Sequence, residues 1–93
     1  MESKMKQFFE DLSIEIKESY GELQRISRHI SKELDNVNAT MASEMDAIKK
    51  IELLESQMQT LVRYKNQYQE EARLLDWNQN MYKKLKESQS ENQ

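Results

Sequence analysis

The side chains that could carry chemistry are few, and the single histidine is the first of them. His29 lies in the segment RISRHISK, where Arg25, Arg28 and Lys32 surround it with positive charge. Such a basic segment could hold a phosphate, and His29 with Glu33 could share a metal ion, because residues four apart lie on one side of a helix. One pair on one helix falls short of the Glu-x-x-His pattern that di-iron bundles place on two helices. We therefore expect a solvated face, with no metal site and no cofactor.

The composition offers little for catalysis. Nucleophilic catalysis requires an activated side chain beside a base, whereas the chain has one histidine and no cysteine. A single glycine cannot build a glycine-rich phosphate-binding loop. The adjacent carboxylates Glu70 and Glu71 point apart on a helix and indicate solubilising charge. We expect no catalytic residues and no enzymatic function.

Two tyrosines raise the question of nucleic-acid binding. Tyr64 and Tyr68 lie one helical turn apart, with Arg63, Lys65 and Arg73 around them. Aromatic side chains among cations can stack on single-stranded nucleic acid. The chain has 14 basic and 17 acidic residues, a net charge of −3, and no strongly basic patch. We expect these tyrosines in a contact between helices, and no nucleic-acid partner.

The elements that must position these side chains follow from hydrophobic periodicity. Apolar residues recur every three or four positions from Met5 to Val37, and again from Met45 to Leu85. Each series is typical of one side of an amphipathic helix. The chain has no proline and one glycine, and it is rich in residues that favour helix. The pattern predicts an all-α fold, an antiparallel two-helix hairpin that is coiled-coil-like and completes a bundle with a partner or a second copy.

The turn is predicted in DNVNATMASEMD, residues 35–46, because asparagine and aspartate side chains compete for backbone hydrogen bonds. Ser43 and Asp46 have the spacing of a capping box, so Ser43 is the predicted N-cap of the second helix. One bent continuous helix remains an alternative, since neither glycine nor proline interrupts this segment. The predicted elements are helices over residues 3–36 and 43–87, a single hairpin domain over 1–87 and a polar, frayed tail over 88–93.

Folding back near residue 39 would leave the second helix longer than the first. Met5 would lie beside about residue 73, so about a dozen residues, the overhang LLDWNQNMYKKL, would lack an intramolecular partner. An exposed apolar patch of this kind marks an interaction surface, and tryptophan and tyrosine are enriched at interface hot spots. A later turn would shorten the overhang. The predicted partner-binding residues are Leu74, Leu75, Trp77, Met81, Tyr82 and Leu85.

The expected partner is an amphipathic helix, either of a second copy in a homodimer or of another helical protein. The N-terminal sequence MESKMKQFFEDL lacks the apolar run of a signal peptide. No segment approaches the about 20 apolar residues that span a bilayer. We therefore expect a cytoplasmic protein without membrane insertion; if it is exported, we expect a non-standard route and export together with a partner.

The length and layout resemble the WXG-type small proteins of type VII secretion, which have two long antiparallel helices and no signal peptide. The Trp-x-Gly motif of their turn is replaced here by Asn36-Val37-Asn38-Ala39. The chain is therefore more similar to the motif-less helical adaptors encoded beside LXG toxins. That resemblance implies an adaptor, or targeting factor, that binds the helical N-terminal domain of a toxin and directs it to the secretion machinery.

Two alternatives remain open at the level of sequence. The segment LESQMQTLVRYKNQYQEEARLL is similar to the coiled coil of flagellar and type III export-stalk proteins, in which leucines precede two tyrosines. A phage-encoded inhibitor that acts by protein binding also matches a small, acidic, helical chain. All three hypotheses share one mechanism, which is association between helices.

Overall fold

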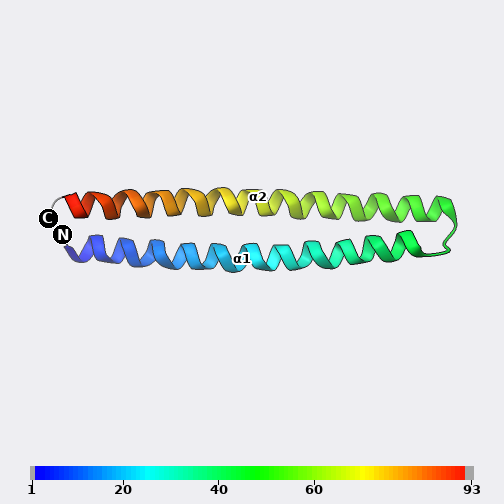
Figure 1. Cartoon of the computed structure of the whole chain (residues 1–93), viewed down its shortest axis with the longest axis horizontal. Helices are drawn as coiled ribbons and strands as arrows, with labels where there is room; N and C mark the ends of the chain where they lie inside the picture. Colours follow the sequence, from blue (N-terminus) through cyan, green and yellow to red (C-terminus); the bar gives the residue numbers. More distant parts are fainter. Residues whose placement is uncertain (1, 92–93) are drawn as a thin grey trace. The chain divides into compact units, whose positions relative to one another are not determined.

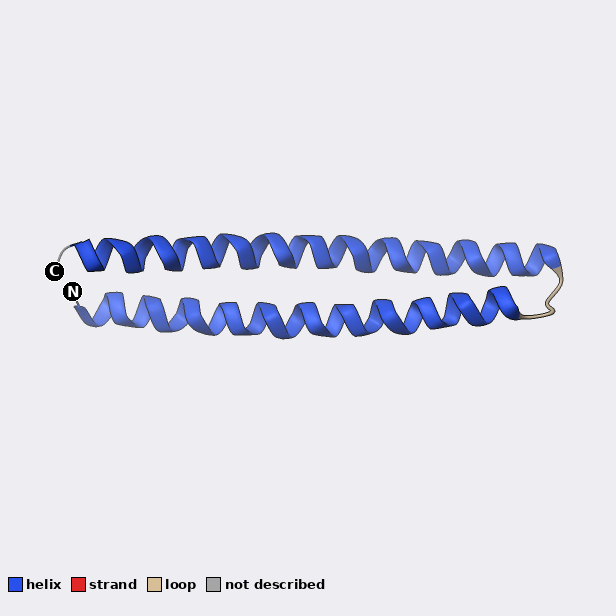
Figure 2. Ribbon diagram, viewed as in Figure 1, coloured by secondary structure: helices blue, strands red, loops and turns tan. Residues whose placement is uncertain are grey.

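The computed structural model of the chain describes residues 2–91 and, for side chains, residues 3–89. It consists of two α-helices, α1 (Glu2–Ala42) and α2 (Ala47–Glu91), joined by a short loop over residues 43–46 (Figure 1). No strand occurs within the described residues (Figure 2). This arrangement confirms the predicted all-α antiparallel helical hairpin and excludes one continuous helix.

The chain divides into two compact units, and each contains one segment of either helix. The terminal unit comprises Met1–Leu23 with Glu70–Gln93, and the turn unit comprises Gln24–Gln69. In the terminal unit the first half of α1 lies beside the second half of α2 (Figure 1). The turn unit contains the loop and the helical segments on either side of it.

The loop over residues 43–46 lies within the predicted turn segment 35–46, but the chain folds back later than near residue 39. α1 continues to Ala42 instead of ending at 36, and α2 begins at Ala47 instead of 43. α2 then continues to Glu91, so residues 88–91 of the predicted tail are helical, while residues 92–93 lie outside the described residues. The helices are therefore of nearly equal length, with 41 and 45 residues.

Helix α1 continues past its predicted end because no residue in that segment disfavours helix strongly enough to stop it. Asn36 uses its side chain locally, donating from Nδ2 to Glu33 Oε2 at 3.3 Å, and its carbonyl accepts a hydrogen bond from Thr40 Oγ1 at 3.0 Å. Val37 is half-buried and Thr40 is buried, so the side of α1 that packs on α2 continues past residue 36. Packing of an amphipathic face outweighs a weak turn preference.

The two predicted capping residues act at different helices. Ser43 Oγ donates to the Thr40 carbonyl at 2.7 Å, so it satisfies a group at the end of α1. Asp46 is the residue before α2, and its Oδ2 lies 3.5 Å from the Lys49 amide as an N-cap would. Lys50 Nζ donates to the Ser43 carbonyl at 3.0 Å and ties α2 to the loop. The prediction that Ser43 caps the second helix is therefore wrong.

Buried and half-buried residues recur every three or four positions along both helices and form a narrow seam between them. Only three apolar side chains, Leu12, Ile26 and Leu75, are buried within the described residues, and fifteen large apolar side chains are exposed. In the terminal unit the seam residues of α1 are Phe9, Leu12, Ile16, Ser19 and Leu23. Those of α2 are Glu71, Ala72, Leu75, Asn78, Tyr82 and Leu85. A pair of helices thus buries one seam and leaves much apolar surface in contact with water.

The seam of the turn unit contains a buried polar pair. Thr40 and Gln57 are 6% and 9% exposed, and Gln57 Nε2 donates to Thr40 Oγ1 at 2.9 Å. Gln57 Oε1 is buried without a hydrogen-bond partner in the described part of the chain. A buried polar pair contributes little net stability but disfavours other pairings, because any shift would leave both groups unsatisfied.

Replacing Thr40 alone should lower the free energy of unfolding more than replacing Thr40 and Gln57 together. We expect Thr40→Val to lower the free energy of unfolding by about 1–3 kcal/mol, because Gln57 Nε2 loses its acceptor inside the seam. Thr40→Val combined with Gln57→Leu should recover most of that loss, since no polar group then remains buried. Urea unfolding followed by circular dichroism measures both variants. Equal destabilisation in the single and double variants would contradict a coupled pair.

Candidate partner-binding surface

The predicted overhang does not exist in this structure, because α1 covers the last turns of α2. With a turn near 39, Phe9 would lie beside residue 69. Phe9 instead packs edge-on against Tyr82, with ring centroids 5.3 Å apart and an interplanar angle of 84°. Gln79 Nε2 also donates to Tyr20 Oη. Both contacts place the second half of α2 against the first half of α1.

The six predicted partner-binding residues fall into two groups. Leu75 is buried and Tyr82 is half-buried against Phe9, so both belong to the seam. Leu74 and Trp77 are 50% and 62% exposed. Met81 and Leu85 are half-buried and line a groove that opens to solvent. The exposed part of the predicted set is therefore Leu74, Trp77 and the outer surfaces of Met81 and Leu85.

Other adjacent apolar pairs divide in the same way as Leu74 and Leu75. Phe8 is 46% exposed while Phe9 is half-buried, and Leu53 is 38% exposed while Leu54 is half-buried. One member packs in the seam and its neighbour reaches solvent, because successive side chains diverge by about 100° around a helix. These pairs therefore give each helix an apolar surface beyond the one that the hairpin uses.

An apolar groove lies between the first turns of α1 and the last turns of α2. Its lining residues are Lys4, Met5, Phe8, Met81 and Leu85. The groove has a volume of about 510 Å³. Methionine and phenylalanine adapt to the shape of an inserted apolar side chain. The periodicity placed Met5 in the seam, but Met5 is 38% exposed and forms part of this wall.

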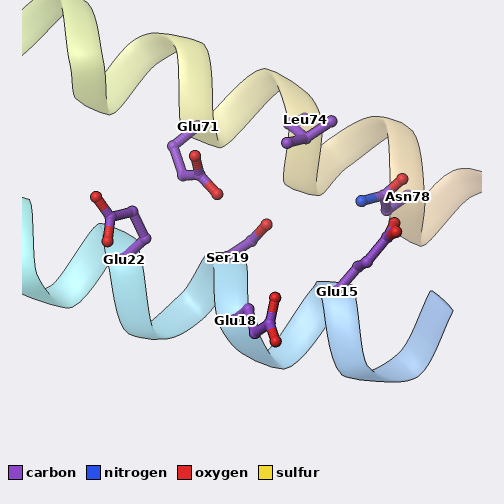
Figure 3. Close-up of a pocket in the computed structure, with 7 residues that line it drawn as sticks. All are labelled: Glu15, Glu18, Ser19, Glu22, Glu71, Leu74 and Asn78. Atoms are coloured by element: carbon purple, nitrogen blue, oxygen red, sulfur yellow. The ribbon is translucent and has the colours of Figure 1, made fainter. Parts of the chain in front are cut away.

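A second groove in the terminal unit is acidic. Its lining residues are Glu15, Glu18, Ser19, Glu22, Glu71, Leu74 and Asn78 (Figure 3). Its volume is about 290 Å³. The carboxylates come from both helices, and Glu71 lies across the groove from the α1 glutamates (Figure 3). This cluster could not be predicted from the sequence, because only the pairing of the helices brings Glu71 to the glutamates of α1.

Both grooves lie on one face of the terminal unit, which we call the terminal face. Its α2 residues are Glu71, Leu74, Asn78, Met81 and Leu85, which follow one another at steps of three and four. Its α1 residues are Lys4, Met5, Phe8, Glu15, Glu18, Ser19 and Glu22. Residues at such steps share one side of a helix. The apolar groove is thus followed along this face by the acidic groove.

The turn unit has an exposed apolar row of its own. Ile48, Ile51, Met58 and Val62 are 69%, 56%, 62% and 48% exposed. The three-and-four periodicity from Met45 to Leu85 includes the first three and predicts them in the contact between helices. The seam instead passes through Lys50, Leu54, Gln57, Leu61 and Tyr64, which are half-buried or buried. Lys50 and Gln57 are polar, so a hydrophobic pattern alone could not predict that they lie in the seam.

The basic segment around His29 is engaged within the turn unit. The rings of His29 and Tyr64 stack with centroids 5.4 Å apart, and Arg25 Nη1 lies 3.3 Å from His29 Nε2. Arg63 lies 5.6 Å from the centroid of the Tyr64 ring. Tyr64 therefore packs between the helices as predicted, whereas Tyr68 is 39% exposed.

No group of three or more His, Cys, Asp or Glu side chains in the described part of the chain could hold a metal ion. Neither helix, over its described length, has a stretch long and apolar enough to cross a membrane. Protein-family models, curated proteins and solved structures give no match to this chain.

Trp77 is the only tryptophan, so its fluorescence reports the state of the terminal unit. Since the side chain is 62% exposed, we expect the emission of a solvated indole, with acrylamide quenching close to that of a short tryptophan peptide. Neither property should change on dilution. Protection from acrylamide that disappears on dilution would show that a second copy covers Trp77.

Proposed function

We propose that this chain is a non-enzymatic helical adaptor that binds an amphipathic helix of another protein along its terminal face. The observation that carries the proposal is the exposure of Leu74 and Trp77 in the same row of α2 as Met81, which lines the open apolar groove. The hairpin buries only three apolar residues of its own within the described chain. Covering this surface would remove from water a tryptophan, a leucine and the groove walls.

The expected energetics fit helix binding. Full burial of a large apolar side chain contributes about 1.5–3 kcal/mol. Trp77, Leu74 and Met81 occupy one row at steps of three and four, which suits a helix laid along α2. A tryptophan near the centre of such a contact is a typical hot spot. Part of the free energy gained by burying these side chains offsets the loss of translational and rotational freedom on association.

Charge favours a different chain over a second copy as the occupant. The grooves contain one cation, Lys4, and several carboxylates, among them Glu15, Glu18 and Glu71. A second copy laid parallel on this face would set carboxylates against carboxylates. A second copy laid antiparallel, with the apolar grooves in contact, would leave the acidic grooves uncovered. Like charges brought together at an interface select against that partner.

The resemblance to motif-less adaptors of LXG toxins supplies the biological setting of the proposal. The partner would be the helical N-terminal domain of such a toxin. The adaptor would bind it in the cytoplasm, cover its apolar helix surface and direct it to type VII secretion. The antiparallel hairpin and the exposed apolar row are compatible with this role, which rests on the resemblance and on the chemistry of the face.

The test is binding to the helical N-terminal domain of an LXG-type toxin from the same genome. We expect a complex of the two chains, and we expect Trp77→Ala with Met81→Ala to weaken it by about 100-fold or more, as for two hot-spot side chains. Isothermal titration calorimetry measures the affinity, and circular dichroism checks that helicity is retained.

Met58→Ala with Val62→Ala is the matched control, because it removes exposed apolar surface from the turn unit. This variant should bind within about threefold of the parent chain, as expected for changes outside the contact. Undiminished binding by the Trp77 and Met81 variant would exclude the terminal face as the site. Failure of the parent chain to bind any such domain would exclude the export role.

A further inference from the structure

We infer that the partner helix carries a lysine or arginine that enters the acidic groove while its apolar residues fill the adjoining apolar groove. This inference rests on the proposed function and adds the chemistry of the partner. It specifies a basic amphipathic helix and a fixed spacing between its apolar anchor and its cation. The residues that carry it are Glu15, Glu18 and Glu71, together with Ser19 and Asn78.

The carboxylates of the groove are arranged unfavourably for the isolated chain. Glu15 and Glu18 are three residues apart on α1, and like charges at that spacing destabilise a helix. Glu71 of α2 lines the same groove and adds a further negative charge from the opposite wall. A cation between the walls would be attracted by all three carboxylates, and exclusion of water by a bound helix would strengthen the attraction.

Two buried polar side chains open into the same groove and provide an independent observation. Ser19 and Asn78 occupy seam positions and are 3% and 6% exposed. Within residues 3–89 neither side chain makes a hydrogen bond, and their polar atoms reach solvent, since only Gln57 Oε1 is fully buried without a partner there. Ser19 points from α1 toward α2 (Figure 3), and Asn78 lines the groove from α2. Their oxygen atoms are acceptors that a donor entering the groove could satisfy.

The combination of acceptors suits a cationic side chain better than a bare metal ion. The carboxylates are spread along a groove of about 290 Å³. A guanidinium has five N–H donors in a planar fork, and an ammonium has three, each on a long flexible stem. Such a group can donate to a carboxylate and to the Ser19 or Asn78 oxygen at once. Leu74 at the edge of the groove can pack against the aliphatic stem.

The spacing of the grooves sets the spacing on the partner. The apolar groove is centred near Phe8 of α1, and the acidic groove extends around Glu15 and Ser19. This separation of about 7–11 residues corresponds to about 10–16 Å along a helix. A partner helix lying along the face therefore needs its cation about two to three turns from its apolar anchor.

The experiment uses two alanine-based helical peptides of about 20 residues, long enough for stable helix. Both contain a pair of leucines one turn apart. One peptide has arginines two and three turns beyond the leucines on the same side, and the other has glutamates there. We expect the arginine peptide to bind the full chain at least about tenfold more tightly at low salt, and this preference to shrink as salt is added. The Trp77 emission and calorimetry measure binding.

Variants of the chain then show which carboxylates cause the preference for the arginine peptide. Glu15→Gln with Glu71→Gln should reduce the preference for arginine to within about twofold. Glu52→Gln with Glu55→Gln removes the same charge from exposed positions of the turn unit and should preserve the preference. Equal affinity for the two peptides, absence of binding at millimolar concentration, or an unchanged preference in the Glu15 and Glu71 variant would overturn the inference.

The failure of this inference can be told apart from the failure of the proposed function. If both peptides bind equally and Trp77→Ala with Met81→Ala abolishes both, the terminal face binds helices without using charge. If that variant binds the arginine peptide as the parent chain does, the cation acts elsewhere, and the terminal face is excluded for both.

Discussion

A two-helix hairpin has no third element to cover a misplaced side chain, so the pairing of α1 with α2 decides which residues reach solvent. In the turn unit this pairing is held by the loop and by the buried hydrogen bond from Gln57 to Thr40. Ser43 binds the end of α1, and Lys50 binds the Ser43 carbonyl. In the terminal unit the edge-on contact of Phe9 with Tyr82 marks the same kind of pairing. A slip by one helical turn would separate these partners and bury different side chains.

The terminal face is a consequence of that pairing. Phe8 and Met81 form opposite walls of an apolar groove only because the first turns of α1 lie beside the last turns of α2. Glu71 joins Glu15 and Glu18 for the same reason. A chain with so few buried apolar residues places its remaining hydrophobic surface where another helix can cover it, beside charges that restrict which helix that is. The contacts between α1 and α2 therefore determine both the stability of the hairpin and the surface that another helix can bind.

The sequence predicted the class of fold correctly because the three-and-four periodicity is sustained along both helices and no glycine or proline opposes it at the seam. It predicted the turn in the right segment, residues 35–46, but too early within it, because asparagine and aspartate preferences are weak beside the packing of a long helix, and Val37 and Thr40 continue the seam. It also assigned Ile48 and Met58 to the seam, where the structure has Lys50 and Gln57.

The exposure of Leu74 and Trp77 was predicted from an overhang that is absent, so the two residues remain candidates for a different reason. The acidic groove joins residues far apart in sequence and could not be found without the pairing. Gly21 lies inside α1, and a side-chain carbon there would meet nothing within 4 Å, so no close packing requires this glycine.

The pairing itself can be measured directly, because the chain has no cysteine and engineered cysteines are therefore unique. Phe8→Cys with Met81→Cys places thiols on opposite walls of the apolar groove, whereas Phe8→Cys with Glu70→Cys tests the pairing of a turn near residue 39. A cross-linker of about 8–10 Å matches the distance between packed helices. Residue 81 lies eleven positions after residue 70, which corresponds to about 16 Å along α2. We expect rapid intramolecular cross-linking for the Met81 pair and little for the Glu70 pair at low protein concentration. Faster cross-linking of the Glu70 pair would contradict the register and, with it, the terminal face.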